Sequence, residues 1–163
     1  MPTATYVPLA TQTLGSASAS ITFSSIPSGY TDLRLVVNFA TGSTSTNPRY
    51  RFNGDTATNY SNQNMLGNGS TTAGGSNTSL STIAAGANIS ASFPATHIFN
   101  IFSYTNTSIY KTGLLLESTD NNGSGSTVAG VALWRGTAAI TSITVLFTTG
   151  TMNTGTTATI WGI

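Results

Sequence analysis

The sequence of 163 residues contains no cysteine, and this absence excludes disulfide bonds and metal sites built on thiolates. Charged residues are almost as scarce, at 6% of the chain against about 25% in an ordinary soluble domain. The formal net charge of +1 provides no basic field to attract nucleic acid, so no nucleic-acid partner is expected. Charge is one of the usual protections against self-association. So neutral a chain is therefore expected to lie in an assembly, or to depend on hydroxyls and amides for solubility.

Long apolar runs are also missing. No stretch approaches the roughly 20 apolar residues of a membrane helix, so no membrane partner is expected. The first residues, MPTATYVPLATQTL, have neither a basic start nor an apolar run, so no signal peptide is expected.

Few side chains could carry out catalysis or hold a metal ion. The one histidine, His97, lies in the apolar stretch ATHIFNIF, where a strand residue with a hydrogen-bonded ring is the ordinary interpretation. No Gly-x-Ser-x-Gly motif surrounds a serine, and no pattern singles out a pair of carboxylates for glycoside hydrolysis. The sequence therefore predicts no enzymatic activity, no catalytic residue, no cofactor and no bound metal. The four acidic residues are Asp32, Asp55, Glu117 and Asp120.

The sequence is rich in short runs of Val, Ile, Phe and Tyr that are separated by Thr, Ser, Gly and Asn. These are strand-forming and turn-forming residues. Alternation is clearest in residues 32–40, where every second residue is apolar, as in a half-buried strand. The predicted buried face consists of Leu33, Leu35, Val37 and Phe39.

Strands are predicted at fairly regular spacing along the chain. The predicted ranges are 3–14, 19–24, 32–40, 49–52, 93–104, 109–117, 127–134, 140–148 and 156–161. Low-complexity segments at residues 41–48, 66–79 and 118–127 are interpreted as loops. This pattern predicts an all-β fold with little or no helix, an antiparallel β-sandwich of jelly-roll type. Residues 1–163 are expected to form one domain, with residues 1–14 a possible extended N-terminal arm.

The stretch YRFNGDTATNYS, residues 50–61, combines turn signals with two of the few charges. Asn53-Gly54 is a strong signal for a tight hairpin, because a type I′ turn needs positive φ at both central residues. Arg51 and Asp55 are interpreted as a charge pair that flanks this turn, with a polar ligand contact as the alternative.

Aromatic side chains near this stretch could stack on a sugar. Tyr50 and Tyr60 flank the turn. Trp134 and Trp161, in the last predicted strands, are expected instead to fill the core of the sandwich. The candidate contacts for a partner or a glycan are Tyr6, Tyr50, Arg51, Asp55 and Tyr60.

Four segments, taken together, resemble a group of small virion structural proteins of tailed bacteriophages. They are SITFSSIPSGYTDLRLVV at residues 20–37, RFNGDTATNYS at 51–61, ALWRGTAAITSITV at 132–145 and TIWGI at 159–163. In that group a strand and turn followed by Tyr-x-Asp-Leu, then Phe-Asn-Gly-Asp, then a terminal aromatic-Gly-Ile recur in this order. The resemblance spans most of the chain, and residues 64–92 depart from it.

The resemblance implies a non-enzymatic structural role in the virion. We expect a capsid decoration (cement) protein on the capsid surface that binds the major capsid protein and stabilises the shell. It is expected to dock through one end or through the N-terminal arm. Because decoration proteins often occupy threefold positions of capsids, a homo-oligomer is expected, with a trimer favoured. The alternative is a tail or fibre adhesin module that binds host-surface glycan, and a free glycan-binding or hydrolytic protein comes third.

Overall fold

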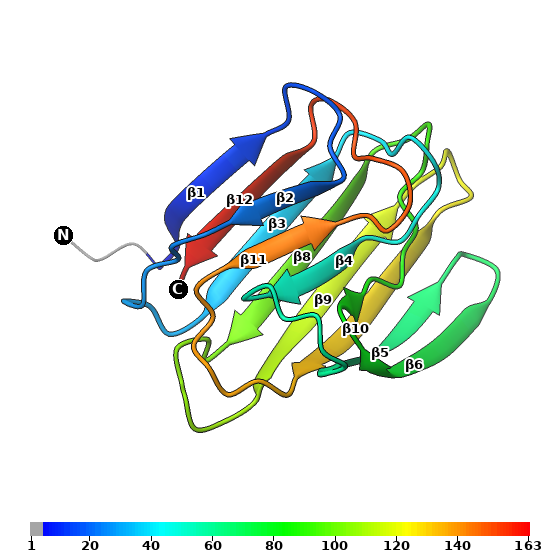
Figure 1. Cartoon of the computed structure of the whole chain (residues 1–163). Coiled ribbons are helices and arrows are strands. Elements are labelled where there is room, and N and C mark those ends of the chain that lie inside the picture. Colours follow the sequence, from blue (N-terminus) through cyan, green and yellow to red (C-terminus); the bar gives the residue numbers. More distant parts are fainter. Residues whose placement is uncertain (1–4) are drawn as a thin grey trace.

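The computed structural model describes residues 5–163 as two antiparallel β-sheets that pack face to face (Figure 1). These residues include no helix, and so none that could cross a membrane. The predicted all-β sandwich is confirmed. The strands are β1 (Val7–Thr13), β2 (Ser20–Phe23), β3 (Leu33–Phe39), β4 (Arg49–Phe52), β5 (Tyr60–Gly67), β6 (Thr72–Leu80), β7 (Ile83–Ala84), β8 (Ala95–Phe102), β9 (Lys111–Thr119), β10 (Ser126–Trp134), β11 (Ile143–Leu146) and β12 (Thr157–Gly162).

The larger sheet has eight strands in the order β1-β12-β3-β8-β9-β10-β5-β6, and the smaller sheet has four in the order β2-β11-β4-β7. Many connections cross from one sheet to the other, as from β2 to β3, from β4 to β5 and from β10 to β11. If the hairpin β8–β9 and the strands β1 and β12 are left out of the larger sheet, its order becomes β3-β10-β5-β6. This sheet lies opposite the smaller sheet, whose order is β2-β11-β4-β7. Together these are the strand orders of a jelly roll. The fold is therefore jelly-roll-like, and the inserted hairpin and added strands widen one of its sheets.

The core lies between the two sheets and includes the predicted face of β3. Leu33, Leu35 and Val37 are 0% exposed and Phe39 is 1% exposed, so this prediction is confirmed. β3 pairs with β12 on one side and with β8 on the other. Its register is firmly set, because a slip by one residue would turn the whole apolar face toward solvent.

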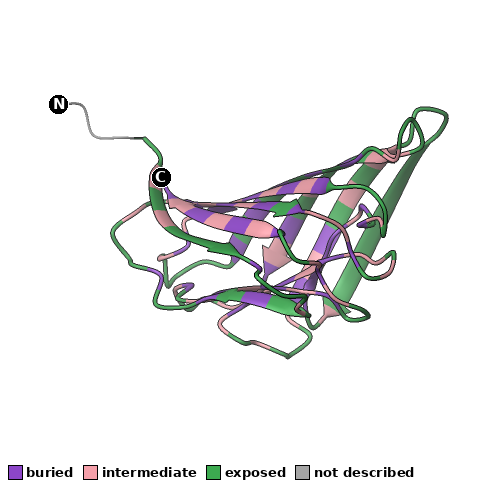
Figure 2. Ribbon diagram, turned by 90° about the horizontal axis from the view of Figure 1, so that it is seen from above, coloured by how far each residue is buried: buried purple, intermediate pink, exposed green. Residues whose placement is uncertain are grey.

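The segment at residues 66–79 was predicted to be a loop, but it contains the end of β5 and most of β6. Its Gly, Ser, Asn and Thr residues show no alternation, because β6 is exposed on both faces up to Ser79. Backbone pairing with β5 holds it in place. In the turn between them, the Oδ1 of Asn68 accepts hydrogen bonds from the N–H groups of Ser70 and Thr71 at 3.0 and 2.8 Å. Figure 2 shows this hairpin reaching beyond the smaller sheet.

The N-terminal segment forms an edge strand of the larger sheet, as Figure 1 shows. β1 pairs antiparallel with β12, and the hydroxyls of Thr11 and Thr159 lie 3.0 Å apart across the two strands. The register shifts between Pro8 and Ala10, where proline has no N–H to donate. Residues 1–4 of the predicted arm lie outside the residues that the structure describes.

Candidate functional site

Residues 52–55 make a tight turn that leads from the smaller sheet toward the larger one. The N–H of Asp55 donates to the carbonyl oxygen of Phe52 at 2.9 Å, and Asn53 and Gly54 have φ values of 51° and 66°. Positive φ at both central residues is the predicted type I′ feature. The predicted hairpin is wrong, because β4 and β5 belong to different sheets and the turn carries the chain across between them.

The side chain of Asn53 fastens this turn to the segment that precedes β11. Its Oδ1 accepts hydrogen bonds from the N–H groups of Thr141 and Ser142 at 2.8 and 3.1 Å. Its Nδ2 donates to the carbonyl oxygen of Ala139 at 2.8 Å. Both ends of the amide are therefore used inside the fold and not for a ligand.

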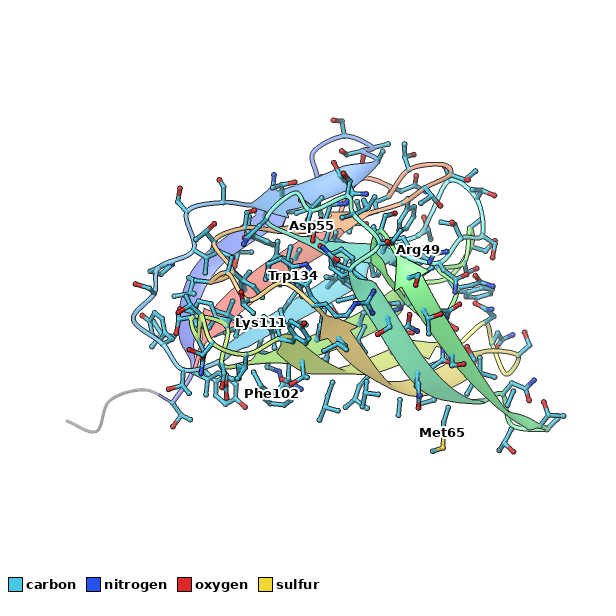
Figure 3. All side chains as sticks on the ribbon, turned by 60° about the horizontal axis from the view of Figure 1, so that its bottom comes forward. Arg49, Asp55, Met65, Phe102, Lys111 and Trp134 are labelled. Carbon is cyan, nitrogen blue, oxygen red and sulfur yellow. The ribbon has the colours of Figure 1, made fainter. Side chains whose placement is uncertain are left out.

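Asp55 is the second anchor of the turn. Its carboxylate accepts hydrogen bonds from Trp134 Nε1 at 2.7 Å, Asn59 Nδ2 at 3.0 Å and the N–H of Ala57 at 2.8 Å. Figure 3 shows Asp55 and Trp134 close to each other. Burial alone would raise the pKa of Asp55, but these hydrogen bonds and the nearby charge of Arg51 together lower it. The charge of Arg51, the predicted partner, therefore has a minor influence on the pKa of Asp55. Neutral hydrogen-bond donors hold the carboxylate in place.

Two candidate contacts, Tyr50 and Tyr60, lie in the core and cannot reach a partner. Both are 0% exposed. The ring of Tyr60 stacks on Trp134 with centroids 6.3 Å apart, and the ring of Tyr50 meets Phe99 edge-on at 5.3 Å. The hydroxyl of Tyr60 donates to the carbonyl oxygen of Phe52 at 3.2 Å. This corrects the expectation that the two tyrosines contact a partner or a glycan, and Trp134 fills the core as predicted.

Tyr6 and Arg51 are the candidates that stay nearer the surface. Arg51 is half-buried on the outer side of the smaller sheet. Tyr6 is exposed beneath the guanidinium of Arg34, which lies 5.6 Å from the ring centroid and donates to the tyrosine hydroxyl at 3.2 Å. Trp161 was predicted to fill the core, but it is half-buried on the outer side of the larger sheet. It lines a hollow of about 370 Å³ together with Tyr6, Arg34 and Val36.

His97 and Glu117 are partners in register on β8 and β9, and both point into the core. The Nδ1 of His97 lies 2.9 Å from the hydroxyl of Tyr50, while its Nε2 is buried without a hydrogen-bond partner. The predicted hydrogen-bonded ring is therefore present on one side only. Burial lowers the pKa of His97 to about 3 and raises the pKa of Tyr50 well above its ordinary value.

The carboxylate of Glu117 ties the segment after β7 to the larger sheet. Its Oε2 accepts hydrogen bonds from the N–H groups of Gly86 and Ala87, each at 2.7 Å. Burial raises the pKa of Glu117 to about 7, although the two N–H donors favour the charged form. A carboxyl with this pKa could transfer protons near neutrality, but the side chain is 3% exposed and faces the closed interior. Its role here is in holding the fold.

Two further charged groups, Asp120 and Lys111, also act within the fold. Among residues 5–163, no three His, Asp or Glu side chains come together in a way that could hold a metal ion. Asp120, the acid of the segment STDNNGSGST, accepts a hydrogen bond from the N–H of Gly123 at 2.8 Å and closes its turn. The buried ammonium of Lys111 donates to three backbone carbonyl oxygens at 2.5 to 2.9 Å.

Sequence reasoning missed the apolar side chains on the outer side of the larger sheet. Leu114, Leu116 and Val131 are 45–51% exposed, and Met65 is 73% exposed. Figure 3 shows Met65 and Phe102 pointing away from the sandwich. The run of three leucines at residues 114–116 could have revealed this face, because consecutive strand residues point to opposite sides. The outer apolar face consists of Val36, Met65, Ile98, Phe102, Leu114, Leu116, Ala129, Val131 and Leu133.

Comparison of the chain with protein-family models, with curated proteins and with solved structures finds no match.

Proposed function

We propose that the chain is a non-enzymatic structural protein of a tailed-bacteriophage virion, a capsid decoration (cement) protein that binds the major capsid protein on the capsid surface. The observation that carries this proposal is the outer apolar face. Contiguous apolar patches on single soluble chains are generally small. A face with Leu114, Leu116 and Val131 about half exposed is therefore expected to function in contact with other chains. A protein of a capsid shell is in contact with neighbouring chains when it functions.

Contacts among the four phage-like segments support the proposal. RFNGDTATNYS and ALWRGTAAITSITV meet at the hydrogen bond between Asp55 and Trp134. SITFSSIPSGYTDLRLVV and TIWGI meet where β3 pairs with β12, and the N–H of Thr31 donates to the carbonyl oxygen of Ile163 at 2.9 Å. The segments that carry the resemblance are thus joined in pairs within the scaffold, and the assignment to phage virions rests on that resemblance.

Particles of the phage that encodes the chain provide the test. In a cryo-electron microscopy reconstruction, we expect density that fits the sandwich to repeat over the outer surface of the capsid. Particles made without the gene should lose this density and release their DNA at a lower temperature. Addition of the purified chain should restore both properties. Density at the tail or baseplate alone, or capsids that are unchanged without the gene, would contradict the decoration role.

A second candidate function is that of a tail or fibre adhesin that binds host-surface glycan. The hollow beside Tyr6, Arg34 and Trp161 favours it, because aromatic rings and guanidinium groups are suited to sugar rings and hydroxyls. The test is titration of host polysaccharide into the purified chain while tryptophan fluorescence is followed. Trp161→Phe should abolish the response, while Tyr110→Phe, at an exposed position outside the hollow, should preserve it. A chain whose fluorescence does not respond to the polysaccharide would exclude this function.

A further inference from the structure

The outer apolar face is continuous across the middle of the larger sheet. One row of cross-strand partners runs from β3 to β5 and consists of Val36, Ile98, Leu116, Ala129 and Met65. The next row contains Leu114 opposite Val131. Neutral polar side chains lie around these rows, and they include Asn38, Thr96, Ser118, Thr127, Gln63 and Ser61. An apolar centre with a polar rim is the usual anatomy of a protein–protein interface.

Charge is nearly absent from this side of the sheet. Among the outward-facing positions of the eight described strands, Arg34 is the one charged residue, and it is engaged by Tyr6. A charged partner would leave its ions desolvated and without counterparts on this face. The partner is therefore expected to be neutral too. The same face of a second copy meets this condition, because almost no like charges would come together across the contact.

The shape of the face is also suited to contact with itself. Three adjoining hollows of about 560, 560 and 610 Å³ follow the outer sides of β10, β5 and β6. The first two hollows share Val131, and the second and third share Met65. The half-exposed Leu114 of β9 lines the first two hollows, and the half-exposed Leu116 of the same strand lies outside all three. In a two-fold contact the same patch meets itself, so the leucines of each copy can face the hollows of the other.

The outer side of the larger sheet is large enough for a stable contact. Strands about 4.8 Å apart and about six residues long, at about 3.3 Å per residue, give a sheet of eight strands a face of roughly 40 by 20 Å. That is about 800 Å² for the whole outer side, which is the area that each partner buries in a standard protein–protein interface. The outer apolar face lies on five of these strands, β3, β8, β9, β10 and β5, so it forms the centre of such a contact and the neutral polar positions around it complete the area.

We propose that a second copy of the chain packs on the outer apolar face, sheet against sheet, about a two-fold axis. Sheets that pack in this way lie about 10 Å apart and cross at an angle set by their twist. The proposal assigns one occupant, a second copy of the chain, to the same outer apolar face that supports the proposed function. Its tests use only the purified chain, so their outcome is separate from that of the particle experiments. The proposal makes a dimer, in place of the trimer expected from capsid geometry, the basic assembly.

The first test is the mass of the purified full chain by sedimentation equilibrium at micromolar concentrations. We expect twice the 16.7 kDa of one chain. Leu116→Lys places two lysines in the contact and should weaken dimerisation about 100-fold or more. Ser20→Lys adds the same charge at an exposed position of β2 and should leave the dimer unchanged. A monomeric or trimeric wild-type chain, or a dimer that Leu116→Lys does not weaken, would overturn the proposal.

The second test does not depend on how well a charged variant folds. Because the chain has no native cysteine, Leu116→Cys provides a single thiol in the centre of the proposed contact. Its reaction with a thiol reagent should be slow in the dimer and should accelerate on dilution. Ser20→Cys should react at the same rate at every concentration. Equal behaviour of the two thiols would show that the outer apolar face is not covered by a second copy.

Discussion

The indole Nε1 of Trp134 donates a hydrogen bond of 2.7 Å to Oδ2 of Asp55, and this bond joins the end of β10 to the turn that follows β4. The two strands belong to different sheets. Each partner is also fixed by other neighbours, Asp55 by Asn59 and Trp134 by the ring of Tyr60. The bond therefore fastens one layer of the sandwich to the other.

Asp55→Ala should lower the free energy of unfolding by about 2–3 kcal/mol, because a hydrogen bond to a charged group is worth that much and the buried indole N–H would lose its acceptor. Urea denaturation measures the loss. Thr56→Ala, one residue away and exposed, is the control and should change stability by less than about 0.5 kcal/mol. Equal stability of the two variants would show that Asp55 does not anchor the turn.

Leu35→Ala should cost about 2–5 kcal/mol, because the side chain is completely buried at the centre of β3 and its removal leaves a cavity. The control is Asn38→Ala on the same strand, whose side chain points outward and is exposed. Thermal unfolding compares the two. A melting temperature for Leu35→Ala that equals that of the wild type would place the core elsewhere.

His97 is expected to make the fold sensitive to acid. Its pKa is about 3 in the folded chain and near 6.5 when unfolded, so the unfolded chain takes up the proton first as the pH falls. The contribution of His97 to stability is therefore lost between about pH 6.5 and 3, by roughly 5 kcal/mol at most. His97→Gln keeps a polar group near Tyr50 but cannot titrate, so its unfolding free energy should fall less than that of the wild type between about pH 4.5 and 3. An identical pH profile for both chains would contradict this role.

Glu117 should have the opposite effect. Its pKa of about 7 in the folded chain lies above the ordinary 4.5, so the folded chain binds the proton more tightly. The stabilisation is complete below about pH 4.5 and is lost as the pH rises through 7, by about 3 kcal/mol. Between about pH 4.5 and 6.5 the effects of Glu117 and His97 oppose each other, so a plateau of stability is expected there.

Melting temperatures of the wild type and of Glu117→Gln at pH 5, 6, 7 and 8 measure this effect. The wild type should lose stability between pH 6 and 8, and the variant should not. If both chains lose the same amount, another group is responsible.

Most strands that bury an apolar face could be predicted from the sequence, because burial imposes alternation on them. β3 is the clearest example, with Leu33, Leu35, Val37 and Phe39 all inward. β5 was missed, because after Tyr60 its inward positions are the polar Asn62 and Asn64. β6 could not be predicted, because it is exposed on both sides, so burial does not require apolar residues on either face. Its structure depends on pairing with β5, which is a relationship between segments and leaves no local pattern.

The candidate site could be predicted only in its turn geometry. Asn53-Gly54 indicates the turn. Whether the chain then forms a hairpin or crosses to the other sheet depends on which sheet the next strand joins, and that is a property of the whole fold. Tyr50 and Tyr60 look like surface aromatics beside a turn, yet the crossing between sheets places both inside. The hydrogen bond from Trp134 to Asp55 joins residues 79 positions apart in the sequence, so no local sequence pattern could have predicted it.

Because the two sheets differ in width, we expect some strands to open locally before the whole domain unfolds. The hairpin of β5 and β6 overhangs the smaller sheet, and β6 has a strand neighbour on one side only. Its amide protons are therefore expected to exchange with solvent deuterium through local opening, without disturbance of the core. The amides of β3, paired on both sides and buried beneath, should exchange only when the whole domain opens.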